Sequence, residues 1–418
     1  MEPFAGRVFT LGVSSGIACY KAVDLMRDLQ RAGARVRVVL TRSAAELVRP
    51  ALFEALSGER PGIELWEDWP APDEPGDYSR FPHLDFARGI DALIVAPATA
   101  NVIGKAAMGI ADDLLSTTLV SVDPARIPVV LVPSMNATMY ENPAVRANRA
   151  TLRARGYALL APGEGELACG EIGVGRWPGN EPILAAIDRL VNGRGRLAGR
   201  RVVVTAGPTQ VDVDPVRVLT NRSSGRMGFA VARACWREGA DVALIHGPTA
   251  IEPPPFVDAV PVRTPEEMGA AVRLALDGAD QLWMAAAVSD WRPIRGSDRK
   301  MKKAEWDGVL RMEPTEDILA RAAVEREPGL TLIGFAVETD GVAERAARKL
   351  ESKGCDWLVV NNPLEEGAGF DHETNRVTVL GRDGSRKEFE LMSKLELAHR
   401  LVDWVLDHTG AEARAPRR

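Results

Sequence analysis

The chain has 418 residues, which at about 150 residues per domain predicts two or three domains. Its 46% hydrophobic and 26% charged residues match ordinary globular proteins, which excludes wholesale disorder and a fibrous repeat. The net charge of −6, from 52 basic and 58 acidic residues, excludes a chain-wide attraction for nucleic acid or anionic lipid.

In the first half of the chain, short β-branched runs alternate with helical stretches, as in a parallel sheet covered by helices on both faces. Residues 8–13 form the first predicted strand, and the apolar residues after it recur at helical spacing until Gly33. Further strands are predicted at 36–41, 92–96, 129–133 and 158–161. A helix at 183–191 completes a first domain of residues 1–191.

Glycines and charges at 192–200 predict a linker, which is followed by a second domain at 201–410 and a tail at 411–418. This domain has a predicted helix at 223–237 and strands at 201–206, 242–246, 282–287, 331–335 and 357–360. The sequence therefore predicts an α/β fold with two doubly wound, Rossmann-like or flavodoxin-like, parallel-sheet domains.

Three further segments depart from this alternation. A hairpin of 376–380 and 387–391 is joined through Asp383-Gly384, a dipeptide favoured in type I′ turns. Residues 66–86 and 292–312 are predicted as long loops, and the second holds the basic run 299–303. Such loops are often functional, although a charged run is more commonly a solvated surface.

Loops that follow predicted strands carry the polar candidates. The turn after the first strand offers backbone N–H groups with Ser14 and Ser15 to a phosphate, or it simply connects two elements. Asn136 could hold a carboxylate or serve as a turn residue. Cys169 lies in the glycine-rich run 168–176, where a thiol could be reactive or structural.

The four cysteines are widely spaced and form no CxxC pair, and the five histidines do not cluster around them. We therefore expect reduced thiols. The amino terminus lacks a signal-peptide pattern, and no stretch approaches about 18 uninterrupted apolar residues. These features predict a cytoplasmic protein without a membrane or nucleic-acid partner.

Taken together and in order, the motifs of residues 8–190 resemble the flavin-dependent phosphopantothenoylcysteine decarboxylases. The matching segments are Gly12-Val-Ser-Ser-Gly-Ile-Ala-Cys-Tyr-Lys21, Pro97-Ala-Thr-Ala-Asn101, Pro133-Ser-Met-Asn136 and Ala168-Cys-Gly-Glu-Ile-Gly-Val-Gly-Arg176. The resemblance implies bound FMN, with contacts from Gly12, Ser14, Ser15, Thr41, Ala98 and Thr99. It also implies catalytic roles for His83, Asn136 and Cys169.

The implied decarboxylation needs an electron sink, because a carboxylate next to an amide nitrogen does not otherwise leave as CO2. FMN would take a hydride equivalent from the carbon that bears the substrate thiol, and the resulting C=S group would accept the electrons. His83 would assist as a base and Asn136 would orient the carboxylate. The enethiolate left after loss of CO2 would then accept a proton from Cys169, while the reduced flavin would return the hydride.

Residues 200–405 resemble the phosphopantothenate-cysteine ligases. The matching segments are Thr205-Ala-Gly-Pro-Thr209, Asp214-Pro-Val-Arg217, Asn221-Arg-Ser-Ser-Gly-Arg-Met-Gly228, Ala285-Ala-Ala-Val-Ser-Asp290, Lys300-Met-Lys-Lys303 and Gly334-Phe-Ala-Val-Glu-Thr339. The resemblance implies CTP as cosubstrate, bound by Met284, Ala285, Ala286, Asp290, Lys300, Thr315, Glu316, Asp317, Ile318, Phe335, Lys349 and Lys353. Arg217 and Asn221 would contact the substrate, and Asn221 and Lys300 would act in catalysis. Mg²⁺ would accompany the triphosphate, through ligands that the sequence does not identify.

The two resemblances together cover nearly the whole chain, as in the fused bacterial enzymes of coenzyme A biosynthesis. They imply 4'-phosphopantothenate and cysteine as substrates, and a homo-oligomer. Decarboxylase trimers that place FMN between subunits, combined with ligase dimers, would give a dodecamer. The chain departs from the family pattern at Trp177-Pro-Gly-Asn-Glu-Pro182 and at Thr315-Glu-Asp-Ile318.

Two other functions are weighed. A nicotinamide-dependent oxidoreductase is disfavoured because the GxGxxG fingerprint with a following acidic residue is absent, and a yellow preparation would exclude it. A non-catalytic flavoprotein that serves as a binding module is disfavoured by the retained His83, Asn136 and Cys169. Pyrophosphate release that depends on CTP would exclude it.

Overall fold

The computed structural model describes residues 2–66, 81–294, 298–302, 308–338, 342–365, 367–369 and 372–409, without the side chains of 342–346. The chain divides into two compact units, Met1–Asn192 and Gly193–Arg418. Most of the loop expected at 66–86 lies outside the described residues, as do Lys303 and the predicted tail.

The first unit is built on a five-stranded parallel sheet with the strand order β2-β1-β3-β4-β5. Its strands are β1 (Val8–Val13), β2 (Arg35–Leu40), β3 (Ala92–Ala98), β4 (Val129–Pro133) and β5 (Ala158–Leu159). All residues of β3 and β4 are buried, because helices cover both faces of the sheet. This order is that of flavodoxin-like sheets, which bind ligands beyond the carboxyl ends of the strands.

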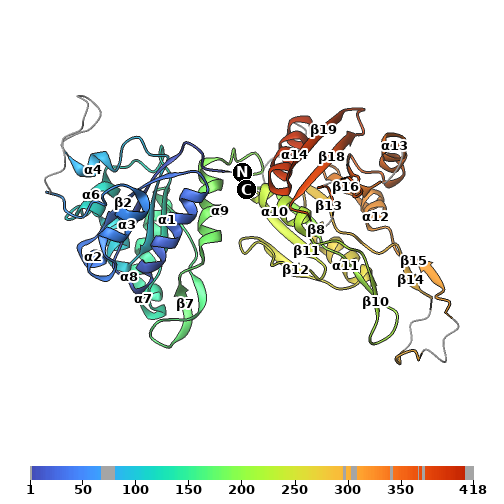
Figure 1. The fold of residues 1–418 in the computed structure, drawn as a ribbon, viewed down its shortest axis with the longest axis horizontal. Helices are drawn as coiled ribbons and strands as arrows, with labels where there is room; N and C mark the ends of the chain where they lie inside the picture. Colours follow the sequence, from blue (N-terminus) through green and yellow to red (C-terminus); the bar gives the residue numbers. More distant parts are fainter. Residues whose placement is uncertain are drawn as a thin grey trace. The chain divides into compact units, whose positions relative to one another are not determined.

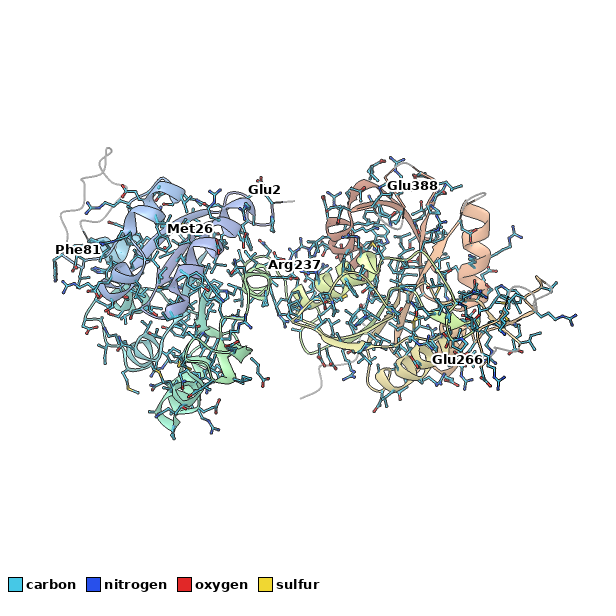
Figure 2. All side chains as sticks on the ribbon, turned by 60° about the horizontal axis from the view of Figure 1, so that its bottom comes forward. Glu2, Met26, Phe81, Arg237, Glu266 and Glu388 are labelled. Carbon is cyan, nitrogen blue, oxygen red and sulfur yellow. The ribbon has the colours of Figure 1, made fainter. Side chains whose placement is uncertain are left out.

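Helices pack on both faces of this sheet. The first face carries η1 (Ile17–Tyr20), α1 (Lys21–Arg31), α2 (Arg42–Leu47), α3 (Pro50–Ser57) and α9 (Asn180–Val191). In α1 the apolar spacing buries one stripe, which includes the fully buried Met26 (Figure 2). The other face carries α5 (Ala100–Met108), α6 (Leu114–Val120) and α8 (Pro143–Ala154), and buried residues that follow the short α4 (Pro82–Asp85) join their core.

The second unit is built on an eight-stranded sheet with the order β12-β11-β8-β13-β16-β17-β18-β19. Its strands are β8 (Arg201–Ala206), β11 (Asp241–His246), β12 (Asp258–Pro261), β13 (Gln281–Met284), β16 (Thr331–Val337), β17 (Trp357–Asn361), β18 (Thr374–Gly381) and β19 (Arg386–Ser393). The first six are parallel, and β18 and β19 extend the sheet as an antiparallel hairpin. The α/β class with parallel sheets is confirmed, with this antiparallel edge in addition.

Two hydrophobic cores lie on opposite faces of the second sheet. One is formed with α10 (Arg226–Arg237) and α14 (Lys394–His408), and the other with α11 (Pro265–Ala275), α12 (Ile318–Glu325) and α13 (Val342–Lys353) (Figure 1). Two small two-stranded sheets project from this body, β9 (Gln210–Asp212) with β10 (Val218–Thr220) and β14 (Trp291–Pro293) with β15 (Met312–Pro314).

Three sequence expectations differ from the structure in ways that specific contacts explain. Most of the predicted linker packs in the second unit, since Leu197 is 2% exposed in its core and its amide donates to the Glu238 carbonyl at 2.8 Å. Strand β13 ends at Met284 rather than at 287, because the next amides bond to loop groups, Ala286 to the Thr205 hydroxyl and Ala287 to the Gly207 carbonyl.

The hairpin turn is the third difference. A type I′ turn requires positive φ at both central residues, but none of the described non-glycine residues has positive φ. The loop instead takes four residues: Gly384, at φ +85°, donates to the Gly381 carbonyl, and the Asp383 carboxylate accepts the Ser385 amide at 2.9 Å. That side-chain bond stabilises Asp383 in ordinary backbone geometry and leaves the left-handed position to glycine.

Candidate active sites

In the first unit, the loops after β1 and β3 meet at the carboxyl edge of the sheet. The buried Ser14 hydroxyl donates to the Pro97 carbonyl at 2.8 Å and accepts the Thr99 amide at 3.1 Å. Ala98 is fully buried, and Thr41 caps α2 through the Ala44 amide at 3.2 Å. The structure thus brings the predicted residues Ser14, Ser15, Thr41, Ala98 and Thr99 to one edge.

The loop that follows β1 offers hydrogen-bond donors. Among the described residues, none accepts a hydrogen bond from the backbone N–H of Ser15, Gly16 or Ile17. Three successive amides with a neighbouring hydroxyl suit a phosphate-bearing ligand. Gly12 has a packing role instead, because an added Cβ would lie 2.3 Å from Cδ1 of Leu115 on α6.

A second group of predicted residues lies around α7 (Ala137–Glu141). Asn136 caps this helix, since its Oδ1 accepts the Thr138 amide at 2.8 Å. Its Nδ2 lies 3.3 Å from the Cys169 Sγ and 2.7 Å from Oε2 of Glu171. The predicted carboxylate-binding amide and the predicted proton donor are therefore adjacent, and Glu171 is a neighbour that the sequence did not single out.

Cys169 reaches Asn136 because the hairpin β6 (Gly163–Glu166) and β7 (Ile172–Arg176) docks on the loop before α7. The Met135 amide donates to the Gly175 carbonyl at 3.0 Å. Gly175 has φ +147°, and an added Cβ would lie 2.0 Å from the Met135 carbonyl oxygen. Glycine is therefore required at this contact.

The departure from the family pattern after Arg176 has a structural explanation. Trp177 is 6% exposed in the core of the first unit, and its indole N–H donates to Asn180 at 3.1 Å. The Asn180 side chain in turn donates to Asp28 on α1 at 2.7 Å. This segment connects the hairpin to the start of α9.

The thiols differ in environment. Cys169 is exposed, whereas Cys19, Cys235 and Cys355 are buried. Burial raises the pKa of all three buried thiols, that of Cys355 to about 11. Because the thiolate is the reactive form, the three buried cysteines are suited to packing rather than to chemistry.

His83 is not part of the Asn136 cluster within one chain. It lies on α4, which is drawn at the opposite end of the first unit from α7 and β7 (Figure 1). Phe81, just before α4, lies at the periphery of this unit and is 51% exposed (Figure 2). The His83 Nδ1 is buried and has no partner among the described residues, which is unusual for a buried polar atom.

In the second unit, a cavity of about 930 Å³ lies beyond the carboxyl ends of the parallel strands. Eleven of the twelve residues predicted to bind CTP line it, all except Lys300, and Asn221 lines it as well. The other polar side chains of its wall include Arg226, Asn375 and Lys394, which sequence reasoning missed. Arg226 lies within the matched segment 221–228 but was given no role, and Asn375 and Lys394 flank the predicted hairpin of 376–391.

Charged pairs fix the cationic wall of this cavity. The Lys349 ammonium lies 2.6 Å from the Glu338 carboxylate, and Lys353 pairs with Asp317. Asp317 also caps α12 through the Ala320 amide at 3.0 Å. The Thr315 hydroxyl donates to the Ser289 carbonyl at 2.6 Å, so the unusual segment 315–318 is held in the wall.

Asn221 is held by backbone groups, since its amide donates to the carbonyls of Ala287 and Val288 at 3.0 and 3.2 Å. The loop after it leads into α10, where Gly228 permits close packing on β8. An added Cβ there would lie 2.7 Å from the Thr205 carbonyl oxygen. The matched segment Asn221-Arg-Ser-Ser-Gly therefore lies in the wall of this cavity.

Arg217 and Lys300 are not among the residues that line the cavity. The Arg217 guanidinium lies 3.2 Å from the buried Asp214 carboxylate, which also accepts the Met301 amide at 3.2 Å. Desolvation alone would raise the pKa of Asp214, but the amides of Val216, Met301 and Arg217 hold it below the ordinary value. The basic run is therefore tethered beside Arg217, with Lys300 exposed.

The comparisons with known proteins agree with this two-unit arrangement. Residues 5–192 match the family model described as Flavoprotein, and residues 197–408 match the model of the DNA/pantothenate metabolism flavoprotein C-terminal domain. The coenzyme A biosynthesis bifunctional protein CoaBC of Bacillus subtilis is 41% identical over 398 residues, 94% of this chain and 95% of the relative. The chain belongs to the CoaBC family.

The CoaBC of Mycobacterium tuberculosis H37Rv is 40% identical over 411 residues, 95% of each chain. A crystal structure of the C-terminal domain of a CoaBC is 35% identical, covers 51% of this chain and 97% of its own, and has a TM-score of 0.44. Among the described parts of this CoaBC family member, no helix is both long and apolar enough to span a membrane. The same residues contain no group of three or more His, Cys, Asp or Glu side chains suited to a metal.

Proposed function

We propose that this chain catalyses two consecutive steps of coenzyme A biosynthesis. CTP-dependent ligation of 4'-phosphopantothenate to cysteine comes first, and FMN-dependent decarboxylation of the product to 4'-phosphopantetheine follows. The observation that carries the proposal is the convergence of the predicted nucleotide residues on one cavity of about 930 Å³, in a chain that resembles CoaBC proteins over nearly its whole length.

In the ligase unit, a free carboxylate is too poor an acyl donor at neutral pH, so transfer of a cytidylyl group supplies a leaving group. We assign the cytidine to Met284–Ala286, Asp290 and Phe335. We assign the phosphates to Lys349 and Lys353, which line the cavity and pair with Glu338 and Asp317. Asn221 would hold the acyl-cytidylate. Mg²⁺ would enter with the triphosphate, because this ion commonly binds through substrate phosphates and one or two carboxylates.

Arg217 and the exposed Lys300 would act from outside the cavity wall. Their tether to Asp214 keeps the basic run close to Arg217, so both cations would approach bound phosphopantothenate and triphosphate from one side. We therefore assign Lys300 to charge stabilisation during cytidylyl transfer.

In the decarboxylase unit, FMN would supply the oxidising electron sink when bound. The unpartnered amides after β1, with Ser14, Ser15, Thr41 and Thr99 around them, suit its phosphate. Asn136 would orient the substrate carboxylate, and the exposed Cys169 thiol, 3.3 Å from its Nδ2, would donate the final proton. A reduced Cys169 requires a reducing compartment, which favours the cytoplasm.

His83 lies apart from Asn136 and Cys169 in one chain, and its Nδ1 has no described partner. We assign His83 to the active site of a neighbouring copy, where it would act as the base in substrate oxidation. This arrangement requires a homo-oligomer. Decarboxylase trimers joined through ligase dimers would close as a dodecamer.

The test is to supply 4'-phosphopantothenate, cysteine, CTP and Mg²⁺ and to follow CO2, pyrophosphate and 4'-phosphopantetheine. We expect equal amounts of the three products, and none without CTP. Supplied phosphopantothenoylcysteine should yield CO2 without CTP. Failure of both reactions in a yellow, folded preparation would overturn the proposal.

A further inference from the structure

The Asn136 side chain uses both of its N–H donors within the protein. Its Oδ1 accepts the Thr138 amide, while Nδ2 donates to the Cys169 sulfur at 3.3 Å and to the Glu171 carboxylate at 2.7 Å. A carboxamide has two N–H donors, and these two contacts use both. A ligand carboxylate therefore gains a donor from Asn136 only by displacing one of the two.

We propose, building on the decarboxylase function above, that Glu171 competes with the substrate carboxylate for the Asn136 amide and so lowers the affinity of this site for ligands that carry a carboxylate. Of the two groups that accept hydrogen bonds from the Asn136 amide, Glu171 is a carboxylate, like the substrate group that would replace it. Its bond to the amide is charge-assisted, whereas a thiol sulfur is a weak acceptor. Two carboxylates at one donor also repel each other, so the protein and substrate carboxylates exclude each other.

The hairpin holds Glu171 in reach while leaving its side chain able to move. The Leu167 amide donates to the Glu171 carbonyl at 2.8 Å, and the Gly170 amide donates to the Leu167 carbonyl at 2.9 Å, so the loop backbone is closed. The Glu171 side chain itself is exposed. Rotation about its own bonds can release Asn136 without undocking the hairpin at Gly175.

This exchange distinguishes substrate from product. Phosphopantothenoylcysteine carries the carboxylate that displaces Glu171, whereas phosphopantetheine has lost it as CO2. Glu171 therefore lowers the affinity of the site for the substrate and leaves the affinity for the product unchanged. Once CO2 has left, the returning Glu171 carboxylate occupies the donor again.

The experiment compares Glu171→Gln with the parent and with Glu164→Gln. Glu164 is a matched control, because it lies on β6 of the same hairpin, is exposed, and has no contact with Asn136 in the described structure. The holoenzymes are reduced with dithionite so that the substrate binds without being oxidised. Calorimetry then gives the dissociation constants of phosphopantothenoylcysteine and 4'-phosphopantetheine.

We expect Glu171→Gln to tighten substrate binding about fivefold, because a neutral amide oxygen competes less strongly for Asn136 than a carboxylate does. Product binding and the Glu164→Gln control should match the parent. An unchanged ratio of the two constants, or weaker substrate binding in Glu171→Gln, overturns the inference. Failure of the parent itself to release CO2 when its flavin is oxidised would instead overturn the proposed function.

Discussion

The two units share a parallel α/β architecture but differ in how completely one chain assembles the proposed site. In the second unit, strand ends, loops, the first turn of α12 and the C-terminal part of α13 gather eleven of the twelve predicted nucleotide residues around one cavity. In the first unit, the candidates lie along the sheet edge and at α7, while His83 lies on the separate α4. The residues proposed for the ligase site thus mostly meet within one chain, whereas the proposed decarboxylase site would need a second copy to supply His83.

The largest effect is expected from Cys169→Ser, which tests whether the decarboxylation steps are separable. Serine is close in size but is a much weaker acid than a thiol, whose ordinary pKa is about 8.5. We expect FMN binding and one release of CO2 per site, followed by arrest. Net formation of 4'-phosphopantetheine should fall by at least about a hundredfold. Flavin absorbance and mass spectrometry of the products give the readout, and normal multiple turnover would remove Cys169 from the mechanism.

Asn221→Asp tests the second unit, which carries the proposed ligase site. The new carboxylate would repel the acyl phosphate that Asn221 is proposed to hold, so amide formation should fall by about a hundredfold. Decarboxylation of supplied phosphopantothenoylcysteine should stay near the parental rate, because Asn221 and Cys169 lie in different units. Separate assays of pyrophosphate and CO2 provide the measurement. Equal loss of both activities would contradict the assignment of one reaction to each unit.

A smaller effect is expected from Lys300→Gln, because this residue is exposed and does not line the cavity. Loss of one cation near the triphosphate should slow acyl-cytidylate formation by about tenfold. Flavin content and decarboxylation serve as internal controls for folding. If the variant turned over CTP as fast as the parent, the basic run 299–303 would be assigned to a solvated surface loop and not to the nucleotide site.

The smallest loss of decarboxylase activity is expected when two variants, each inactive alone, are combined in one oligomer. Co-expression of His83→Asn with Cys169→Ser should restore roughly a quarter of the parental decarboxylase activity. In random oligomers, this is the fraction of sites that combine an intact His83 from one copy with an intact Cys169 from another. Sizing with light scattering should show an oligomer. Absence of complementation in a mixed oligomer would place His83 and Cys169 in the same chain's site.

Sequence reasoning succeeded where a local pattern carries the information. The α1 helix follows from the spacing of Ala22, Leu25, Met26 and Leu29, which form its buried stripe. The bounds of β1, β4 and β8 also agree with the predicted 8–13, 129–133 and 201–206. Strand ends identify the candidate loops because parallel strands share one carboxyl edge.

Elsewhere the decisive contacts are between residues far apart in the chain. Glu171 lies 35 positions from Asn136, yet the docked hairpin brings the two within 2.7 Å, and the sequence run around Cys169 does not indicate which side chain faces the amide. Arg226, Asn375 and Lys394 reach the cavity from three elements and carry no shared motif. The prediction of a type I′ turn at Asp383 was wrong because a hydrogen bond between the Asp383 side chain and Ser385 favours a four-residue loop over the tight turn.

The sequence by itself determined the two doubly wound sheets, the order of the motifs and the chemistry their residue types allow, because apolar periodicity and strand-end loops are local properties. Tertiary structure decided which of those residues meet. It placed Cys169 beside Asn136 through the close approach of Gly175 to Met135, and it left His83 on a separate helix. The physical reason is that such meetings depend on packing between distant segments, where a single Cβ or a single carboxylate changes the outcome.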